Sequence, residues 1–215
     1  MINILIADDH EIVRSGYRRL FEASGKIKVI AEAASGPQAF TLYKKNRPDV
    51  LLIDIMMPGP GIVASIHRII SYNPSAYILV VSMHDNLSFV ERCFKAGALG
   101  YITKLSPANT LLDGVSQVAK GKRFISSDIA EKMALNQLTP KQGSTLSALT
   151  PREFEVFLRL AKGQSISDIS NEMHISNKTI SNYASKIKKQ LSLSNTAELI
   201  HLALQENLIE NTYYL

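Results

Sequence analysis

Short apolar runs alternate with helical patterns over roughly the first 121 residues of the chain. The runs that suit buried strands are Ile4–Ala7, Ile27–Ala33, Val50–Ile53, Ile78–Val81 and Gly100–Thr103. Apolar residues after the first and last runs keep helical spacing, as do Val13, Tyr17, Leu20 and Phe21, and Leu111, Leu112, Val115 and Val118. Strands that alternate with helices are typical of a parallel sheet with right-handed crossovers. The pattern therefore predicts an α/β doubly wound domain with a five-stranded parallel sheet over residues 1–121.

The pattern changes after residue 121. Residues 122–147 are expected to form a linker, in which 126–136 could be a short helix and 137–145 are polar, with Pro140 and Gly143. From Thr150 onward the spacing is helical alone, so residues 148–215 are expected to form an all-α domain of four helices.

The third helix of this second domain, residues 177–191, is expected to have two different faces. Its apolar face carries Ile180, Ala184, Ile187 and Leu191, and its opposite face carries Lys178, Asn182, Ser185 and Lys189. A shorter helix and a tight turn precede it, and in that helix Ile166, Ile169 and Met173 are expected to face inward. This order predicts helix-turn-helix geometry, in which the second helix enters the DNA groove.

Reactive side chains stand just past the predicted strands of the first domain. Asp8 and Asp9 follow the first run, and Asp54, Ser82 and Lys104 follow three others. Open α/β sheets bind ligands outside the carboxyl ends of their strands. Neighbouring carboxylates need a cation to stay ionised, and Mg²⁺ suits such oxygen ligands. A carboxylate can also accept a phosphoryl group while a metal and a lysine counter the developing charge. We therefore expect a phosphoryl-and-metal site at this edge.

Composition narrows the class of protein only in part. The net charge of +5 favours an anionic partner, and 46% apolar residues suffice for sizeable cores. Cys93 is the single cysteine, which excludes an internal disulfide and fits a reducing compartment. The sequence has neither an apolar run of membrane-spanning length nor a signal peptide, so a cytoplasmic location without a membrane partner is expected.

The N-terminal motifs resemble the receiver domain of two-component response regulators, a flavodoxin-like fold. They are residues 6–14 (IADDHEIVR), residues 54–58 (DIMMP), Ser82 and residues 100–104 (GYITK). The resemblance implies that Asp54 accepts a phosphoryl group from a sensor histidine kinase, in a bacterial two-component system. It also implies Mg²⁺ ligands and a phosphoryl-sensing switch. The ligands would be Asp8, Asp9, Asp54 and the carbonyl oxygen of Met56, and the switch Ser82, Tyr101 and Lys104. The chain departs from the family in the loop Pro58–Gly61, which is shorter by a residue, and in having Leu105 rather than proline after the lysine.

The C-terminal motifs resemble the LuxR/NarL output domain and are reminiscent of the GacA/UvrY subgroup. They are residues 149–153 (LTPRE), 169–173, 175–180 (ISNKTI) and Leu191. The resemblance implies binding to double-stranded promoter DNA, followed by contact with RNA polymerase. It assigns base edges to Ser181, Asn182 and Ser185, and phosphates to Lys178, Thr179, Lys186 and Lys189. Asparagine can pair bidentately with adenine.

The last predicted helix has apolar residues on more than one face, among them Ile200 and Leu204. One set can pack on the core while the other meets a second copy, because in this family the final helix commonly forms a dimer contact. A fully packed terminal helix is the alternative.

The leading hypothesis is a transcription regulator, not an enzyme, in which phosphorylation of Asp54 promotes dimerisation and exposes the recognition helix. A metal-dependent phosphohydrolase with Asp54 as nucleophile would explain the acidic pocket but not the second domain. An RNA-binding antiterminator attached to a receiver is a third reading, and the short helix, tight turn and capped long helix argue against it.

Overall fold

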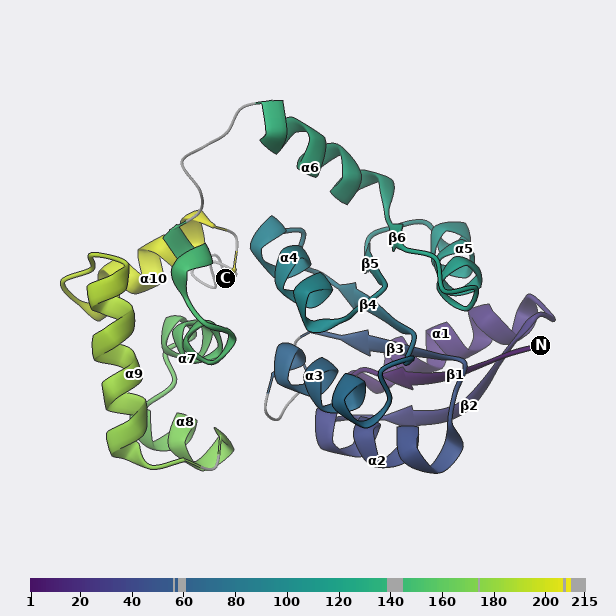
Figure 1. Cartoon of the computed structure of the whole chain (residues 1–215), viewed down its shortest axis with the longest axis horizontal. Coiled ribbons are helices and arrows are strands. Elements are labelled where there is room, and N and C mark those ends of the chain that lie inside the picture. Colours follow the sequence, from purple (N-terminus) through teal and green to yellow (C-terminus); the bar gives the residue numbers. More distant parts are fainter. Residues whose placement is uncertain (56, 58–60, 139–144, 174, 207, 210–215) are drawn as a thin grey trace. The chain divides into compact units, whose positions relative to one another are not determined.

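The computed structural model describes residues 1–55, 57, 61–138, 145–173, 175–206 and 208–209. The chain divides into two compact units, residues 1–138 and 139–215 (Figure 1). In the described residues, no helix combines the length and the apolar character needed to cross a bilayer.

The first unit is a six-stranded parallel sheet in the order β2-β1-β3-β4-β5-β6. Its strands are β1 (Ile2–Ala7), β2 (Ile27–Ala33), β3 (Val50–Asp54), β4 (Ile78–Ser82), β5 (Gly100–Thr103) and β6 (Phe124–Ile125). Five of them are the predicted strands. The expectation of a five-stranded sheet was wrong, because β6 is only two residues long and has no periodic signal in the sequence. Backbone pairing defines it instead: Phe124 N–H donates to Leu99 O at 3.0 Å, and Ser126 N–H donates to Tyr101 O at 3.1 Å.

Helices cover both faces of this sheet, as predicted (Figure 1). They are α1 (Glu11–Ala23), α2 (Gly36–Asn46), α3 (Ile62–Tyr72), α4 (Leu87–Ala96) and α5 (Ala108–Val118). On one face, Phe21 of α1 and Val115 of α5 pack with Ile4, Leu52 and Val81 in a fully or almost fully buried core. Strands β3 and β4 are buried along their whole length, as expected for central parallel strands that read as continuous apolar runs.

The helix expected within residues 126–136 is α6 (Ser127–Leu138), which belongs to the first unit. Its first turn is tied to the end of β5, since Thr103 Oγ1 donates to Asp128 Oδ2 at 2.8 Å. Further along, Lys132 forms an ion pair with Asp85 in the loop after β4. These contacts tie α6 to the end of β5 and to the loop after β4, while most of its described residues are exposed.

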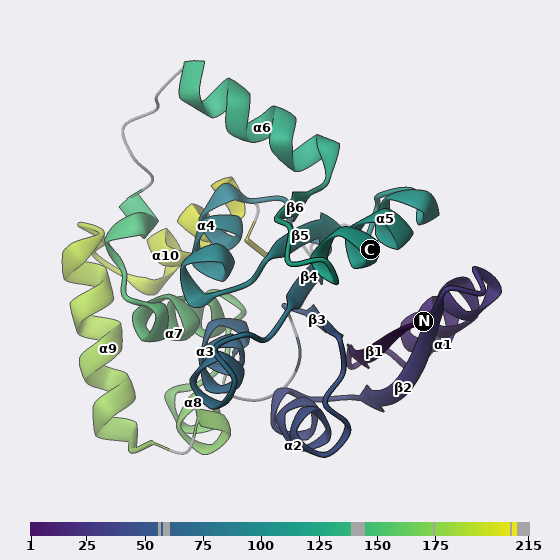
Figure 2. The same cartoon turned by 45° about the vertical axis from the view of Figure 1, so that its right-hand side comes forward.

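The second unit is helical, with a 3₁₀ turn (Thr145–Ala148) and the predicted four helices: α7 (Pro151–Ala161), α8 (Ile166–Met173), α9 (Asn177–Gln190) and α10 (Thr196–Gln205). Helix α7 packs against α9 and α10, and α8 packs against α9 (Figure 2). Ile169 and Met173 of α8 are buried, but Ile166 is 38% exposed. Its predicted inward orientation was wrong, since it is the first residue of the helix and lies beyond the packed stripe.

Candidate functional site

The polar residues predicted at the carboxyl edge of the sheet lie together in the structure. Asp8 directly follows β1, Asp54 is the last residue of β3, Ser82 is the last of β4, and Lys104 directly follows β5. Parallel pairing in register, with Asp54 opposite Val81 and Ser82 opposite Thr103, brings these strand ends to one edge.

Lys104 joins two of the carboxylates. Its Nζ donates to Asp8 Oδ2 at 2.6 Å and to Asp54 Oδ2 at 2.8 Å, although these residues are 96 and 50 positions away in sequence. Burial by itself lowers the pKa of Lys104, but the hydrogen bonds and charges of Asp54 and Asp8 outweigh it and raise that pKa. Lys104 is therefore held as a cation against two almost fully buried acids.

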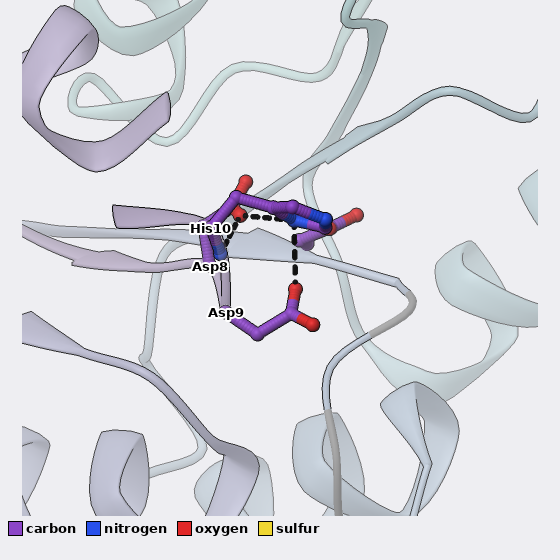
Figure 3. Close-up of side chains that lie close together, drawn as sticks. Asp8, Asp9 and His10 are labelled. Atoms are coloured by element: carbon purple, nitrogen blue, oxygen red, sulfur yellow. Dashed lines mark hydrogen bonds and ion pairs between the residues drawn. The ribbon is translucent and has the colours of Figure 1, made fainter. Parts of the chain in front are cut away.

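Asp9 and His10 complete the acidic cluster. His10 Nδ1 lies 3.1 Å from Asp8 Oδ1 and 3.0 Å from Asp9 Oδ1 (Figure 3). One ligand atom from each of Asp8, Asp9, His10 and Asp54 can be chosen so that all four lie within 4.8 Å of one another. Asp9 Oδ1 is buried; its contact with His10 Nδ1 is an ion pair, and it accepts no hydrogen bond from the described residues. A buried carboxylate oxygen of this kind is a ready ligand for a hard divalent cation.

Ser82 and Tyr101 both form a hydrogen bond with the backbone of His84. Both side chains are fully buried. The His84 N–H donates to Ser82 Oγ at 2.9 Å, and Tyr101 Oη donates to the His84 carbonyl oxygen at 2.6 Å. Burial raises the pKa of the Tyr101 phenol, so it stays a hydrogen-bond donor at physiological pH. The backbone of His84 is therefore hydrogen-bonded to both Ser82 and Tyr101.

Two of the predicted features beside Asp54 fall partly outside the described residues. Met56 lies outside them, as do residues 58–60 of the shortened loop. The adjacent Met57 is buried, and α3 begins one residue after Gly61, which has a φ of 79°. After Lys104, the peptide bond to Leu105 is trans.

Arg14 and Tyr17 of α1 belong to this neighbourhood and were not predicted as site residues. Arg14 Nη1 donates to the carbonyl oxygen of Asp8 at 2.7 Å. Burial raises the pKa of Tyr17 to about 12, an effect that the Lys104 charge opposes. The helical spacing that assigns Tyr17 to the core does not reveal that the same helix reaches the carboxyl edge. Arg14 could have been suspected from the sequence, because it lies one to two helical turns after Asp8 and Asp9.

In the second unit, α9 presents the predicted polar face. Lys178, Asn182, Ser185 and Lys189 are all exposed, whereas Ile180 and Ile187 on the other face are fully buried. The Ser176 side chain caps the helix by accepting from Thr179 N–H at 3.1 Å. The basic side chains on this face are therefore carried by a capped, well-anchored helix.

Three of the predicted DNA-contacting residues on α9 already have protein partners. Ser181 Oγ donates to the Asn177 carbonyl oxygen at 2.9 Å, and Thr179 Oγ1 lies 2.8 Å from Ser176 Oγ. Lys186 Nζ lies 2.7 Å from Glu153 Oε1, a buried oxygen of the α7 capping box. A hydroxyl or an ammonium can make more than one hydrogen bond, so these contacts leave each side chain able to bind a further partner.

On α10, Leu199 and Ala203 are buried in the core of the second unit. Ile200 and Leu204, the predicted dimer residues, are partly exposed. The helix therefore has apolar area on the side that does not face its own core.

Family models match both units of the chain. Residues 4–116 match the response regulator receiver domain, and residues 147–203 match the bacterial regulatory proteins of the luxR family. The chain belongs to the LuxR family of response regulators. It combines a receiver with a LuxR-type helix-turn-helix domain, the arrangement of a DNA-binding transcription regulator controlled by phosphorylation.

Full-length relatives share this arrangement. The chain is 35% identical over 209 residues to the response regulator UvrY of Escherichia coli K12, covering 97% of this response regulator and 96% of UvrY. It is 31% identical over 211 residues to the response regulator GacA of Pseudomonas aeruginosa PAO1, covering 98% and 99%. Among solved structures, RcsB from Salmonella enterica serovar Typhimurium, bound to promoter rprA in the presence of the phosphomimetic BeF3−, has a TM-score of 0.73. The two chains are 26% identical, with 94% of this chain and 98% of RcsB covered.

Proposed function

We propose that a sensor histidine kinase phosphorylates this response regulator at Asp54 and that phosphorylation controls its binding to promoter DNA. The observation that carries the proposal is the contact of Lys104 with both Asp8 and Asp54 at the carboxyl edge of the sheet. In phosphotransfer, an Asp54 oxygen would attack the phosphorus of the kinase phosphohistidine, and the P–N bond would break as the new P–O bond forms. Lys104 is placed to counter the charge on the transferred group.

The donor set supports Mg²⁺ as the metal of this pocket. Asp8, Asp9, Asp54 and the Met56 carbonyl would hold it, and the buried Oδ1 of Asp9 offers an oxygen without a hydrogen bond in the described structure. When bound, the ion would neutralise charge on the phosphoryl oxygens. Asp8 and Asp54 both accept from Lys104, and an Asp54 oxygen would be the nucleophile in the transfer.

The signal would leave the pocket through His84. Ser82 Oγ accepts from the His84 N–H, and Tyr101 donates to the His84 carbonyl. If Ser82 turned towards a phosphoryl group on Asp54, its bond to His84 would weaken, and the constraint on the Tyr101 hydroxyl would change with it. A two-state rearrangement of this segment gives phosphorylation a route to the α4 and β5 surface.

Double-stranded promoter DNA is the proposed partner of α9. RcsB, the structural neighbour described above, was solved on promoter DNA, and α9 presents its exposed lysines on one face. Ser181, Asn182 and Ser185 would meet base edges, and Lys178, Thr179, Lys186 and Lys189 would meet phosphates. The proposal includes a cytoplasmic homodimer through Ile200 and Leu204, half-sites about 10 base pairs apart or a multiple of that, and contact with RNA polymerase.

Labelling with acetyl phosphate and MgCl₂, followed by intact mass, tests the acceptor. Asp54→Asn should abolish the adduct, because an amide cannot act as the nucleophile. Asp113→Asn, on the exposed side of α5, removes a carboxylate outside the pocket and should label like the wild type. An Asp54→Asn protein that still labels would show that the acceptor lies elsewhere. A single stoichiometric adduct supports the regulator, whereas steady turnover of a phosphoester would support a phosphohydrolase.

A further inference from the structure

Arg14 connects the acidic loop to the sheet. Its Nη1 donates to the carbonyl oxygen of Asp8 at 2.7 Å, and its Nε donates to Glu32 Oε2 at 3.3 Å. The side chain is only 14% exposed. Because a guanidinium is planar and rigid, fixing its Nε on one partner also fixes the direction in which its Nη1 points.

The bond to the Asp8 carbonyl acts on the peptide between the two acids. This peptide unit carries the Asp8 carbonyl at one end and the backbone nitrogen of Asp9 at the other, so its orientation determines where the Asp9 side chain leaves the chain. Asp8 has fixed side-chain contacts of its own, with Lys104 Nζ at 2.6 Å and the His10 N–H at 2.8 Å. Asp9 Oδ1 is buried and lies 3.0 Å from His10 Nδ1 as an ion pair, but accepts no hydrogen bond from the described residues.

Glu32 gives the arrangement a rigid base. It lies in β2, which pairs with β1, and Glu32 is in register with Ile6 just before the acidic loop. Its second oxygen, Oε1, accepts from Arg18 Nε at 2.6 Å. Arg18 directs its Nη1 to Glu22 and to the Val29 carbonyl oxygen. Arg14 and Arg18 thus share the same carboxylate, but only the Arg14 hydrogen bonds reach the acidic loop.

We propose that Arg14 is a positioning residue for the acidic pocket. It orients the Asp8–Asp9 peptide so that both acids face Asp54, and it thereby sets the affinity of the pocket for a divalent cation. The inference rests on the proposed function, which assigns a metal to this pocket.

The sign of the expected effect separates positioning from electrostatics. Arg14 is a cation near a site for another cation, so by charge alone its removal should strengthen metal binding. Positioning predicts the reverse: loss of a residue that orients metal ligands typically weakens metal affinity by about 10–100-fold.

The test compares the full-length variants Arg14→Ala, Arg14→Lys and Arg18→Ala. The probes are Mg²⁺, followed by the rise of the melting temperature with MgCl₂ concentration, and Mn²⁺, followed by electron paramagnetic resonance of the free ion. Arg14→Ala should bind both ions about 10–100-fold more weakly than the wild type. Arg14→Lys, which can keep one donor near the Asp8 carbonyl without the fork to Glu32, should fall between them. Arg18→Ala removes the same charge and the same partner and should stay within about twofold of the wild type.

Several outcomes would overturn the inference. Unchanged or tighter binding by Arg14→Ala would show that the Asp8 carbonyl contact does not position the ligands. Equal weakening in Arg14→Ala and Arg18→Ala would assign the effect to the Glu32 cluster as a whole. If Arg14→Ala is poorly folded without metal, as judged by its melting temperature, Arg14→Met replaces it: this change keeps much of the side-chain volume, removes the donors to Asp8 and Glu32 and should also weaken binding. A wild-type protein that binds neither ion would overturn the metal assignment and this inference together, whereas wild-type binding with an unaffected Arg14→Ala overturns only the inference.

Discussion

Lys186 Nζ lies 2.7 Å from Glu153 Oε1, and this ion pair joins α9 to the first turn of α7. The other oxygen of Glu153, Oε2, accepts from the Thr150 N–H at 2.7 Å and closes the capping box. Glu153 is only 1% exposed, whereas the Lys186 side chain is 59% exposed. One carboxylate therefore caps one helix and anchors the proposed recognition helix.

Glu153→Gln should loosen the start of α7 and its junction with α9. The amide keeps the shape but loses the charge that both donors use, and hydrogen bonds to charged groups typically contribute about 1.5–3 kcal/mol. Hydrogen exchange measured by mass spectrometry on the full chain should show faster exchange in peptides from α7 and α9. Lys189→Gln, which changes an exposed lysine of the same helix, serves as the control and should leave exchange in α7 unchanged.

The same carboxylate makes the second unit sensitive to acid. Burial raises the pKa of Glu153, but hydrogen bonds from Lys186 and Thr150 outweigh it and hold the pKa below its ordinary value of 4.5. A group whose pKa is lower in the folded state stabilises the fold above its unfolded pKa, and this contribution is lost as pH falls through the folded pKa. Exchange protection in α7 should therefore decline as pH falls below about 4.5, after correction for the intrinsic exchange rate. Glu153→Gln should remove this part of the decline; an identical pH profile in the variant would assign the acid sensitivity to other groups.

Lys104→Met should destabilise the receiver and make it more dependent on added metal. Removing one partner of a buried ion pair costs about 3–5 kcal/mol, because Asp8 and Asp54 would remain buried as like charges. A divalent cation can replace the lost ammonium, so MgCl₂ should raise the melting temperature of the variant more than that of the wild type. The control is Lys95→Met, which breaks a surface pair with Glu91 and should cost at most about 1 kcal/mol. Equal metal responses in Lys104→Met and the wild type would contradict a shared role for the ammonium and the cation.

Much of this architecture was predictable from the sequence because buried parallel strands are continuous apolar runs. Five strands and their terminal polar residues could be placed in this way, and parallel connectivity brought Asp54 and Lys104 to one edge. The sixth strand could not be predicted, because two residues are too few to show a periodic pattern. Strand β6 is defined only by its pairing with β5. The contact of Arg14 with the Asp8 carbonyl could not be predicted either. Every residue has a backbone carbonyl, so the sequence does not indicate which one a side chain will bind.

The polar face of α9 was also predicted in part. Helical periodicity correctly assigned Asn182 and Lys189 to the exposed side. Periodicity could not reveal that the ammonium of Lys186 forms an ion pair with Glu153, which lies 33 positions earlier and on another helix. Helical periodicity indicates which face of a helix a residue lies on, but not which partner a long, flexible side chain contacts.

The proposed DNA contacts of α9 predict two different kinds of loss. Lys189→Ala should weaken binding to specific and unrelated duplexes alike, and should reduce the magnitude of the salt slope by about one, because one phosphate contact releases about one counterion. Asn182→Ala should leave the salt slope unchanged and cost about 1–3 kcal/mol at one base pair of the preferred site. Titrations at several salt concentrations, on a selected site and on its single-base variants, separate the two effects. Uniform loss on every duplex in Asn182→Ala would contradict its assignment to a base edge. Lys186→Ala offers an intermediate case: because its ammonium is shared with Glu153, it should reduce affinity and also raise hydrogen exchange at the start of α7, which Lys189→Ala should not do.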